Sequence, residues 1–562
     1  RVYQGILLMS LPQWTTEITD KTVDGEDQLG VEGVAQSYQQ TILPGITTVT
    51  DHARYYSYYA WIIYRFIYHG DPKKLVKNFR GLFFKRHEVA LILSAYKHHE
   101  QGSPFSGVIG SGVNNIKVRR FWGDRNIASL DQEYFQNTEG GFGQYYHIAM
   151  QNMDILLEAE EPRLIYRLTD RGKRLAEAYE ASIKDTSYFA RLEQNEQIAE
   201  ISEDEAKDYG HVGCICPNAI QLGKDKDLIL DTFFRFDLPQ DNSNPHIRRR
   251  NSLGVALDLV ARADNQFQRD MLRPALYIGE YRPGLRYDPS LELRDWVKRW
   301  QMVEVRHIFT LGLQSLWAAF LLELNARNDI TKQEWAEWLN SRIIENNWNT
   351  SVENVSKKIC QEAGVSANFN ELRKITQQFF LLQSELDEYS LYLKANRNQT
   401  NSKLLFQTGA KILLQLYLRF YQDYSTQNPL WKEIASKPRL PIEQFFKSMD
   451  EKLKTDKWSM TEWTSWVYQE YIFEQHEIIA LEKLRYQEYD TFKFYFEEDT
   501  FHWPTGKKNY REPIRLAANR LGNCLTMLVD LGLISESSDG ILSLTQEGKN
   551  YYKKVLEGFR QQ

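Results

Sequence analysis

Two stretches that lie far apart in the chain repeat one short pattern. Residues 166–173 read Tyr-Arg-Leu-Thr-Asp-Arg-Gly-Lys, and residues 542–549 read Leu-Ser-Leu-Thr-Gln-Glu-Gly-Lys. In both, a short apolar strand ends at the leucine, the threonine is a favourable N-cap, and an amphipathic helix follows. The glycine lies one turn into that helix, where it allows close packing on a neighbour. The pattern therefore predicts a strand that leads directly into a helix at each place.

The residues before the C-terminal copy extend it to a helix, a hairpin and a second helix. Pro513 can start the first helix, because proline is favoured at the first helical position. Three leucines share one face of that helix: Leu521, Leu525 and Leu528. Gly532 follows as a helix-ending residue in the left-handed conformation. The Ser-Ser-Asp-Gly sequence at 537–540 then favours a tight turn between two short strands.

The earlier copy predicts the same order in a looser form. Residues 145–157 would form its central helix, 158–162 a short acidic wing and 165–168 the return strand. The order helix, strand, turn, strand and helix resembles the winged helix-turn-helix family, whose modules bind DNA or other proteins. We therefore expect two winged-helix modules in this chain, of which the C-terminal one is the clearer.

The resemblance also implies which C-terminal residues would contact DNA. Residues 514–531 would be the recognition helix, with Arg515 and Arg520 facing the groove or the backbone. Three further basic residues would meet phosphates: Lys507, Lys508 and Arg511. The wing at 537–539 would touch an adjacent groove, although its acidic character departs from the family pattern.

Most of the remaining sequence has helical periodicity, which predicts a mainly α protein. The hydrophobic fraction of 42% suits large packed cores, and 491–496 is the clearest strand of the second half. The predicted order is a multi-helical body with one winged-helix module in the N-terminal region and one at the C-terminus. The predicted domains are 1–70 (a segment with an aromatic helix), 71–187 (winged-helix-like), 188–490 (helical body) and 491–562 (winged helix).

Two further features admit both a structural and a nucleic-acid interpretation. The helix predicted at 51–69 carries tyrosine, tryptophan and phenylalanine on nearly every face, as expected of a buried core helix or of a platform that stacks single-stranded bases. Basic residues are concentrated at 72–125, including Arg119 and Arg120. A second basic cluster, Arg248, Arg249 and Arg250, lies at the start of a predicted helix. Cations there oppose the helix dipole, so this triplet predicts a phosphate-facing patch or an internal ion-pair network.

Charge and cysteine content limit the class of protein. The net charge of −6 means that DNA contacts must come from local patches. Four cysteines in 562 residues do not form a disulfide framework, which indicates a reducing, cytoplasmic environment. The longest apolar run, at 316–322, is too short to cross a bilayer, so no membrane partner is expected.

Motifs of known chemistry do not emerge from the sequence. Cys214 and Cys216 form a Cys-x-Cys pair near His211, but four metal ligands are not in evidence, so neither a metal nor a cofactor is predicted. Glu-x-Lys at 205–207 and 547–549 matches a nuclease spacing in helical surroundings, where that geometry is wrong. His476 on a helix predicts a structural hydrogen-bond donor more strongly than a general base.

The predicted function is that of a non-enzymatic DNA-binding and complex-assembling subunit. Two alternatives stay open: a scaffold that docks on an ATPase through its winged helices, as in the kleisin subunits that this layout also resembles, and a metal-dependent nuclease. More loosely, size and layout resemble large proteins of bacterial antiviral defence operons. That resemblance implies double-stranded DNA as one partner and an ATPase or nuclease from the same operon as another.

Overall fold

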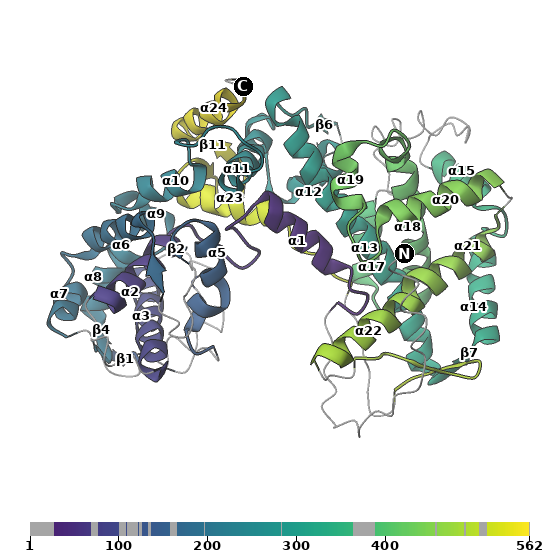
Figure 1. Cartoon of the computed structure of the whole chain (residues 1–562), viewed down its shortest axis with the longest axis horizontal. Coiled ribbons are helices and arrows are strands. Elements are labelled where there is room, and N and C mark those ends of the chain that lie inside the picture. Colours follow the sequence, from purple (N-terminus) through teal and green to yellow (C-terminus); the bar gives the residue numbers. More distant parts are fainter. Residues whose placement is uncertain are drawn as a thin grey trace. The chain divides into compact units, whose positions relative to one another are not determined.

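The structure is a computed structural model, and it confirms the mainly α fold (Figure 1). It describes residues 27–68, 77–99, 108, 122, 126–132, 137–157, 166–195, 197–282, 284–362, 388–455, 458–487, 491–504 and 514–560. The chain folds into two compact units. We name Arg1–Ala35 with Val305–Ala517 the bundle unit, and Gln36–Glu304 with Ala518–Gln562 the module unit.

These units differ from the four consecutive domains that the sequence predicts. The expected helical body at 188–490 is divided at residue 304, inside a single unbroken helix, α13 (Arg294–Arg327). The two ends of the chain also contribute to units formed mainly elsewhere in the sequence. Both segments that the sequence pattern predicts as winged helices belong to the same module unit.

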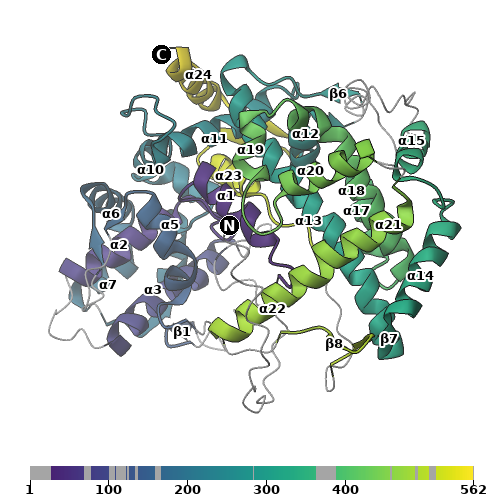
Figure 2. The same cartoon turned by 45° about the vertical axis from the view of Figure 1, so that its right-hand side comes forward.

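The bundle unit is built from helices around the second half of α13 (Figure 2). Its other elements are β7 (Asp329–Thr331), α14 (Lys332–Glu345), α15 (Val352–Glu362), α17 (Glu388–Arg397), α18 (Ser402–Ser425), α19 (Pro429–Ala435), α20 (Ile442–Thr455), α21 (Met460–Trp466), the π-helical η7 (Val467–Phe473), α22 (Glu474–Gln487), β8 (Tyr495–Glu497) and β9 (Thr500–His502). The three strands form an antiparallel sheet in the order β7-β9-β8. The strand expected at 491–496 therefore forms slightly later, at 495–497.

Helix α13 is the one described helix that is long and apolar enough to cross a bilayer, but 89% of that apolar window is buried inside the protein. Its burial is that of a core helix. Part of this burial comes from a close crossing of α13 with α18. The two backbones are so near that a Cβ at Gly409 would lie 2.8 Å from the carbonyl oxygen of Gly312. Glycine at both positions lets the two helix backbones approach without a side chain between them.

The described residues of the module unit contain the remaining helices and four short two-stranded sheets. From the first half of the chain come α1 (Glu32–Ile42, which begins in the bundle unit), α2 (Tyr55–Tyr68), α3 (Lys77–His98), β1 (Ile127–Ser129), the π-helical η3 (Phe142–Tyr146), α5 (His147–Asn152), β2 (Leu156–Leu157), β3 (Arg167–Leu168), α6 (Asp170–Ile183), α7 (Ser187–Gln194), β4 (Glu200–Ser202), α8 (Glu203–Gly213), α9 (Pro217–Leu222), α10 (Lys226–Phe234) and α11 (Pro245–Ala261). Then follow η4 (Arg269–Met271), α12 (Leu272–Ile278), β5 (Glu280–Arg282), β6 (Leu285–Arg286), η5 (Leu291–Leu293), α23 (Arg520–Asp530), β10 (Ile534–Glu536), β11 (Leu542–Leu544) and α24 (Gln546–Arg560).

The aromatic helix α2 is a core helix, as the structural interpretation predicts. Nearly all its side chains are buried, so they cannot stack on exposed bases. Arg54, just before the helix, forms an ion pair with Asp225 in which both side chains are fully buried. Arg65 pairs with Glu180 and Glu193. The basic residues of this segment thus balance carboxylates within the module unit.

Candidate functional site

The C-terminal segment forms the predicted helix, hairpin and helix: α23, then β10 and β11 paired antiparallel, then α24. The prediction that the first helix spans 514–531 is wrong at its start. Residues 514–519 are not helical, and α23 begins at Arg520 because the side chain of Asn519 accepts a hydrogen bond from the backbone N–H of Leu521 at 2.8 Å. Asn519 is therefore the last non-helical residue and the N-cap of α23.

The earlier copy has the same order, with η3 and α5 as the helix, β2 and β3 as the hairpin, and α6 as the second helix. The sequence pattern predicts that its first helix continues to residue 157. In the structure this helix ends at Asn152. The reason is that Asp154 takes the left-handed conformation, with φ of +61°, and Leu156 and Leu157 become the first strand. The acidic wing expected at 158–162 lies outside the described residues.

The two copies share one hydrogen-bond skeleton. At the end of the first helix, Ile155 N–H donates to the Met150 carbonyl at 3.0 Å, and Leu533 N–H donates to the Leu528 carbonyl at 2.9 Å. The residue after each return strand forms the same bond in both copies. Thr169 N–H donates to the Ile155 carbonyl, and Thr545 N–H donates to the Leu533 carbonyl, both at 3.0 Å. Gly532, with φ of +74°, takes the place of Asp154. We conclude that the module unit contains the same supersecondary structure twice.

The repeated threonine and glycine explain this likeness. The hydroxyls of Thr169 and Thr545 accept hydrogen bonds at 3.0 Å from the backbone N–H groups of Gly172 and Gly548, which caps α6 and α24. A Cβ on Gly172 would lie 2.3 Å from the Ile155 carbonyl oxygen, and one on Gly548 would lie 1.9 Å from the corresponding oxygen of Leu533. Only glycine allows the second helix to pack this closely on the hairpin.

Each copy packs on a long buried helix, which in the C-terminal copy comes from a distant part of the sequence. In the first copy α2 contacts η3, β3 and α6, and in the second α11 contacts α23, β11 and α24. Figure 1 shows α11 in teal beside the yellow α23 and α24. The sequence pattern did not identify α11 as part of the C-terminal module, because no local signal links residues 245–261 to residues 520–560.

In the C-terminal copy, residues of the same unit contact the helix that the winged-helix resemblance would assign to DNA recognition. Asn523 donates to a carboxylate oxygen of Asp51 at 2.6 Å, and Arg269 donates to the hydroxyl of Thr526 at 2.9 Å. At the end of the helix, Asp530 is buried against His52, with 2.9 Å between Oδ2 and Nδ1. Residues of the segment before α2 therefore occupy the side of α23 that would enter a DNA groove.

The C-terminal wing is covered in a similar way. Leu542 N–H donates to the Phe267 carbonyl at 2.8 Å, which adds a bridge beside the β10–β11 hairpin. At the turn, the side chain of Gln268 donates to the carbonyl of Asp539 at 3.2 Å, and Arg269 forms an ion pair with Glu536 at 2.9 Å. Glu536, just before the predicted wing, thus has a protein partner, and Asp539 is held through its backbone carbonyl.

Within the described residues, the corresponding face in the first copy is more exposed. When the two helices are aligned through their shared skeleton, Gly522, Thr526 and Val529 correspond to Gln144, Ile148 and Gln151. The side chain of Gln144 is exposed, Ile148 is 55% exposed, and Gln151 is half-buried. Leu157, on the first strand of the hairpin, is 47% exposed. The aligned positions of the C-terminal copy are half-buried, and among them Thr526 bonds to Arg269. The two copies therefore share a fold and differ in how far this helix face is exposed.

The C-terminal residues predicted to contact DNA are placed differently from the expectation. Arg515 is exposed but lies before the helix. Arg520 is buried and donates to the Ile46 carbonyl at 3.3 Å, and burial lowers its pKa, so its assignment to a DNA surface is wrong. The three phosphate-contacting candidates lie outside the described residues: Lys507, Lys508 and Arg511. Arg119 and Arg120 lie outside them as well.

Two of the three arginines at the start of α11 form neither a phosphate patch nor, among the described residues, an ion-pair network. Arg249 is fully buried and donates to the carbonyls of Phe233 and Asn152, at the ends of α10 and α5, where a cation is favoured by the helix dipole. Burial lowers its pKa to about 9. Arg250 is also buried and donates to the Arg235 carbonyl at 2.9 Å. Both residues are unavailable to phosphates, whereas Arg248 is half-buried with one bond to a loop carbonyl.

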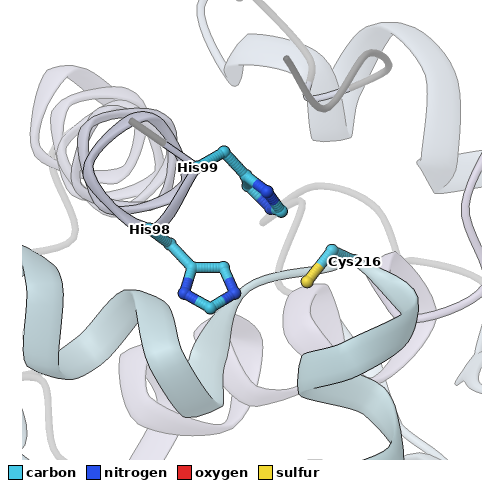
Figure 3. Close-up of side chains that lie close together, drawn as sticks. All are labelled: His98, His99 and Cys216. Carbon is cyan, nitrogen blue, oxygen red and sulfur yellow. The ribbon is translucent and has the colours of Figure 1, made fainter. Parts of the chain in front are cut away.

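A group of possible metal ligands forms around Cys216, one member of the Cys-x-Cys pair. Nitrogen atoms of His98 and His99 and the sulfur of Cys216 all lie within 4.8 Å of one another (Figure 3). Hydrogen bonds from Cys214 and from both imidazoles lower the pKa of Cys216, whereas burial raises the pKa of Cys214. The adjacent histidine pair was the missing signal, but nothing in the sequence joins it to cysteines more than 100 residues away.

The remaining candidates for chemistry have structural roles. Glu205 completes the capping box of α8 with Ser202, and Glu547 pairs with Lys226 at 2.8 Å at the start of α24. His476 is buried: its Nε2 accepts the N–H of Lys493 at 3.0 Å, and its Nδ1 lies 3.2 Å from the Gln28 carbonyl. The structural role predicted for this histidine is confirmed.

Comparisons with known proteins return no match, neither to a protein-family model, nor to a curated protein, nor to a solved structure.

Proposed function

We propose that this protein is a cytoplasmic, non-enzymatic subunit that binds duplex DNA through the helix η3–α5 of its first module and assembles with other proteins. The observation that carries the proposal is the difference between the two copies. The same helix–hairpin–helix structure occurs twice, and of three aligned positions on its first helix two are exposed in the first copy, whereas all three are half-buried in the C-terminal copy. The C-terminal copy then serves the packing of the module unit.

The more exposed helix face of the first copy (the open face) has the chemistry that reads base edges. Glutamine pairs with adenine through two hydrogen bonds in the major groove, and an apolar side chain contacts the thymine methyl group. Gln144 and Gln151 each lie about one turn from Ile148 on this helix, and two of the three are exposed. Arg167 on β3 is also exposed, at the strand where a wing would approach the backbone. This set supports contact with an A·T-containing groove.

The test is binding of the full chain to a labelled duplex of random sequence across a salt series, compared with Gln144→Glu combined with Gln151→Glu. These changes keep side-chain size and place two negative charges on the open face. The proposal predicts wild-type affinity that falls steeply with salt, because released counterions drive phosphate binding. The double variant should bind at least about tenfold more weakly.

The matched control is Gln546→Glu combined with Asn550→Asp, which adds the same charge at exposed positions of α24. Its binding should equal that of the wild type. Equal affinities for all three proteins would remove the open face from the DNA contact. A wild-type chain that leaves the duplex unbound at low salt would overturn the DNA function.

A second candidate is a scaffold that docks on a protein partner such as an ATPase. Two observations favour it: the C-terminal copy already uses its recognition face to bind protein, within its own unit, and α22 in the bundle unit carries exposed Ile478 and Leu481 one turn apart. Ile478→Glu with Leu481→Glu should then abolish co-purification with the products of adjacent genes and leave DNA binding unchanged. A place in a bacterial defence operon, with an ATPase or nuclease partner, belongs to this proposal and rests on the resemblance alone.

A further inference from the structure

We propose that His98, His99, Cys216 and Cys214 bind a zinc ion that joins the end of α3 to the connection between α8 and α9. This site is independent of the proposed DNA contact. Figure 3 shows the two imidazoles at the end of one helix and the Cys216 side chain at the start of another, converging on a common space. Two histidines and two cysteines form one of the ligand sets of structural zinc sites.

The distances suit a tetrahedral metal. The donor atoms of His98, His99 and Cys216 lie within 4.8 Å of one another, and Cys214 Sγ lies 3.7 Å from His99 Nε2. Zinc–sulfur and zinc–nitrogen bonds of about 2.3 and 2.0 Å place two ligands of a tetrahedral site roughly 3.5 Å apart. The donors of His98, His99 and Cys216 thus need only a small contraction to enclose one ion, and Cys214, whose sulfur lies beside His99, completes the set by moving toward the other two.

The fold brings these residues together by close helix packing. Helices α3 and α8 lie side by side, and a Cβ on Gly210 would come 2.4 Å from the carbonyl oxygen of Ser94. Glycine at this position lets α8 approach the last turn of α3, so that the residues just beyond Gly210 reach the two histidines. Cys216 is the N-cap residue of α9, and Pro217 sets the direction of that helix.

The cysteine segment is held from behind by buried groups. Arg54 donates to the carbonyls of Val212 and Cys214 at 2.6 and 2.7 Å, and its own charge is balanced by Asp225. The hydroxyl of Tyr179 donates to the Gly213 carbonyl at 2.8 Å. Outer groups of this kind fix the orientation of metal ligands. The same residues therefore present both thiols toward the histidines before any ion binds.

The ligand types select the metal. Thiolate and imidazole favour zinc over magnesium or calcium, which prefer oxygen ligands. A set of four protein ligands leaves no position for a substrate, which is the arrangement of a structural site and not of a catalytic one. We therefore expect bound zinc to stabilise the module unit.

The experiment is metal analysis of the purified full chain, followed by chelation and titration with Co²⁺, whose visible spectrum reports tetrahedral thiolate ligation. The proposal predicts one zinc per chain, a tetrahedral cobalt spectrum, and a thermal unfolding midpoint that falls on chelation and recovers with zinc. His99→Ala and Cys216→Ser should lose zinc. Cys214→Ser should lower the thiolate-to-cobalt charge-transfer band by about half, since one of two thiolates is removed.

Two controls separate ligand loss from general damage. His211→Ala removes an exposed imidazole whose ring lies 6.0 Å from that of His98, and Cys524→Ser removes a buried thiol elsewhere in the unit. Both should keep the full zinc content. A wild-type chain that contains no zinc and gives no tetrahedral cobalt spectrum overturns the site, and loss of zinc in His211→Ala with retention in His99→Ala overturns this ligand set. An unchanged charge-transfer band in Cys214→Ser overturns Cys214 as the fourth ligand.

Discussion

Asp530 accepts a hydrogen bond from the backbone N–H of Ala53 at 3.1 Å, and the same carboxylate oxygen lies 2.9 Å from Nδ1 of His52. Both side chains are almost fully buried. Burial raises the pKa of Asp530, while the adjacent imidazole opposes that shift. This contact joins the end of α23 to the segment before α2 and keeps the C-terminal copy closed.

Removing this carboxylate should destabilise the module unit. Asp530→Ala leaves His52 and the Ala53 amide buried without their partner, and breaking a buried pair of this kind lowers the free energy of unfolding by about 3 kcal/mol. Asp539→Ala, at an exposed turn position of the wing, should change it by no more than about 0.5 kcal/mol. Calorimetry of the full chain measures both. Equal unfolding midpoints for the two variants would show that the contact does not hold the module.

Alanine substitutions of glycine should have opposite effects at two nearby helices. Gly548→Ala places a Cβ 1.9 Å from the Leu533 carbonyl oxygen and should destabilise the protein by about 1–3 kcal/mol. Gly522→Ala on α23 meets nothing within 4 Å and should stabilise the protein by up to about 1 kcal/mol, because alanine favours the helix. Urea unfolding at constant pH compares the two. A shift in the same direction for both would contradict the close packing of α24 on its hairpin.

The buried pair of Arg54 and Asp225 should show strong coupling. Arg54→Ala leaves a buried carboxylate without its cation and should lower the free energy of unfolding by about 3–5 kcal/mol. The double variant Arg54→Ala with Asp225→Ala should be no less stable than the single one, because the unpaired charge is gone. A double-mutant cycle measures this coupling. Losses that simply add would mean that the two side chains stabilise the fold independently.

Glu88 should give the module unit a dependence on pH near neutrality. Burial raises its pKa from 4.5 to about 7, although Tyr59 and the amides of Gly141 and Phe142 donate hydrogen bonds to it. The native state therefore holds the proton more tightly than the unfolded state. The stability contributed by this group is fully present below pH 4.5 and is lost as the pH rises to about 7.

Relative to Glu88→Gln, which cannot ionise, the wild type should lose about 3 kcal/mol across that range. Unfolding free energies of both proteins, measured from about pH 4.5 to pH 8, test this prediction. Parallel profiles would show that Glu88 keeps an ordinary pKa in the folded protein.

Local signals predicted the repeated structure well. The capping threonines, the close-packed glycines and the Asp-Gly turn each act within a few residues, so the hairpins and their following helices could be read from the sequence. The burial of α2 was also predictable, because aromatic residues on every face leave no side for water.

Long-range packing decided the features that the sequence did not reveal. Arg249, Arg250 and Arg520 have the composition of a nucleic-acid patch, yet each is buried against carbonyl groups contributed by other segments. The division of the chain inside α13 and the meeting of His99 with Cys214 depend in the same way on contacts between distant residues. Charge and periodicity describe single segments and do not show which segments will cover them.

The origin of α11 has a consequence for how the protein is made. Roughly 260 residues separate the end of this helix from the start of α23, and ribosomes add about 5–20 residues per second. For some tens of seconds, the side of α11 that later contacts α23 and α24 lacks both partners. The newly synthesised chain must carry this apolar surface uncovered until α23 and α24 have been synthesised. It is therefore the segment of the nascent chain at which we expect a chaperone to bind.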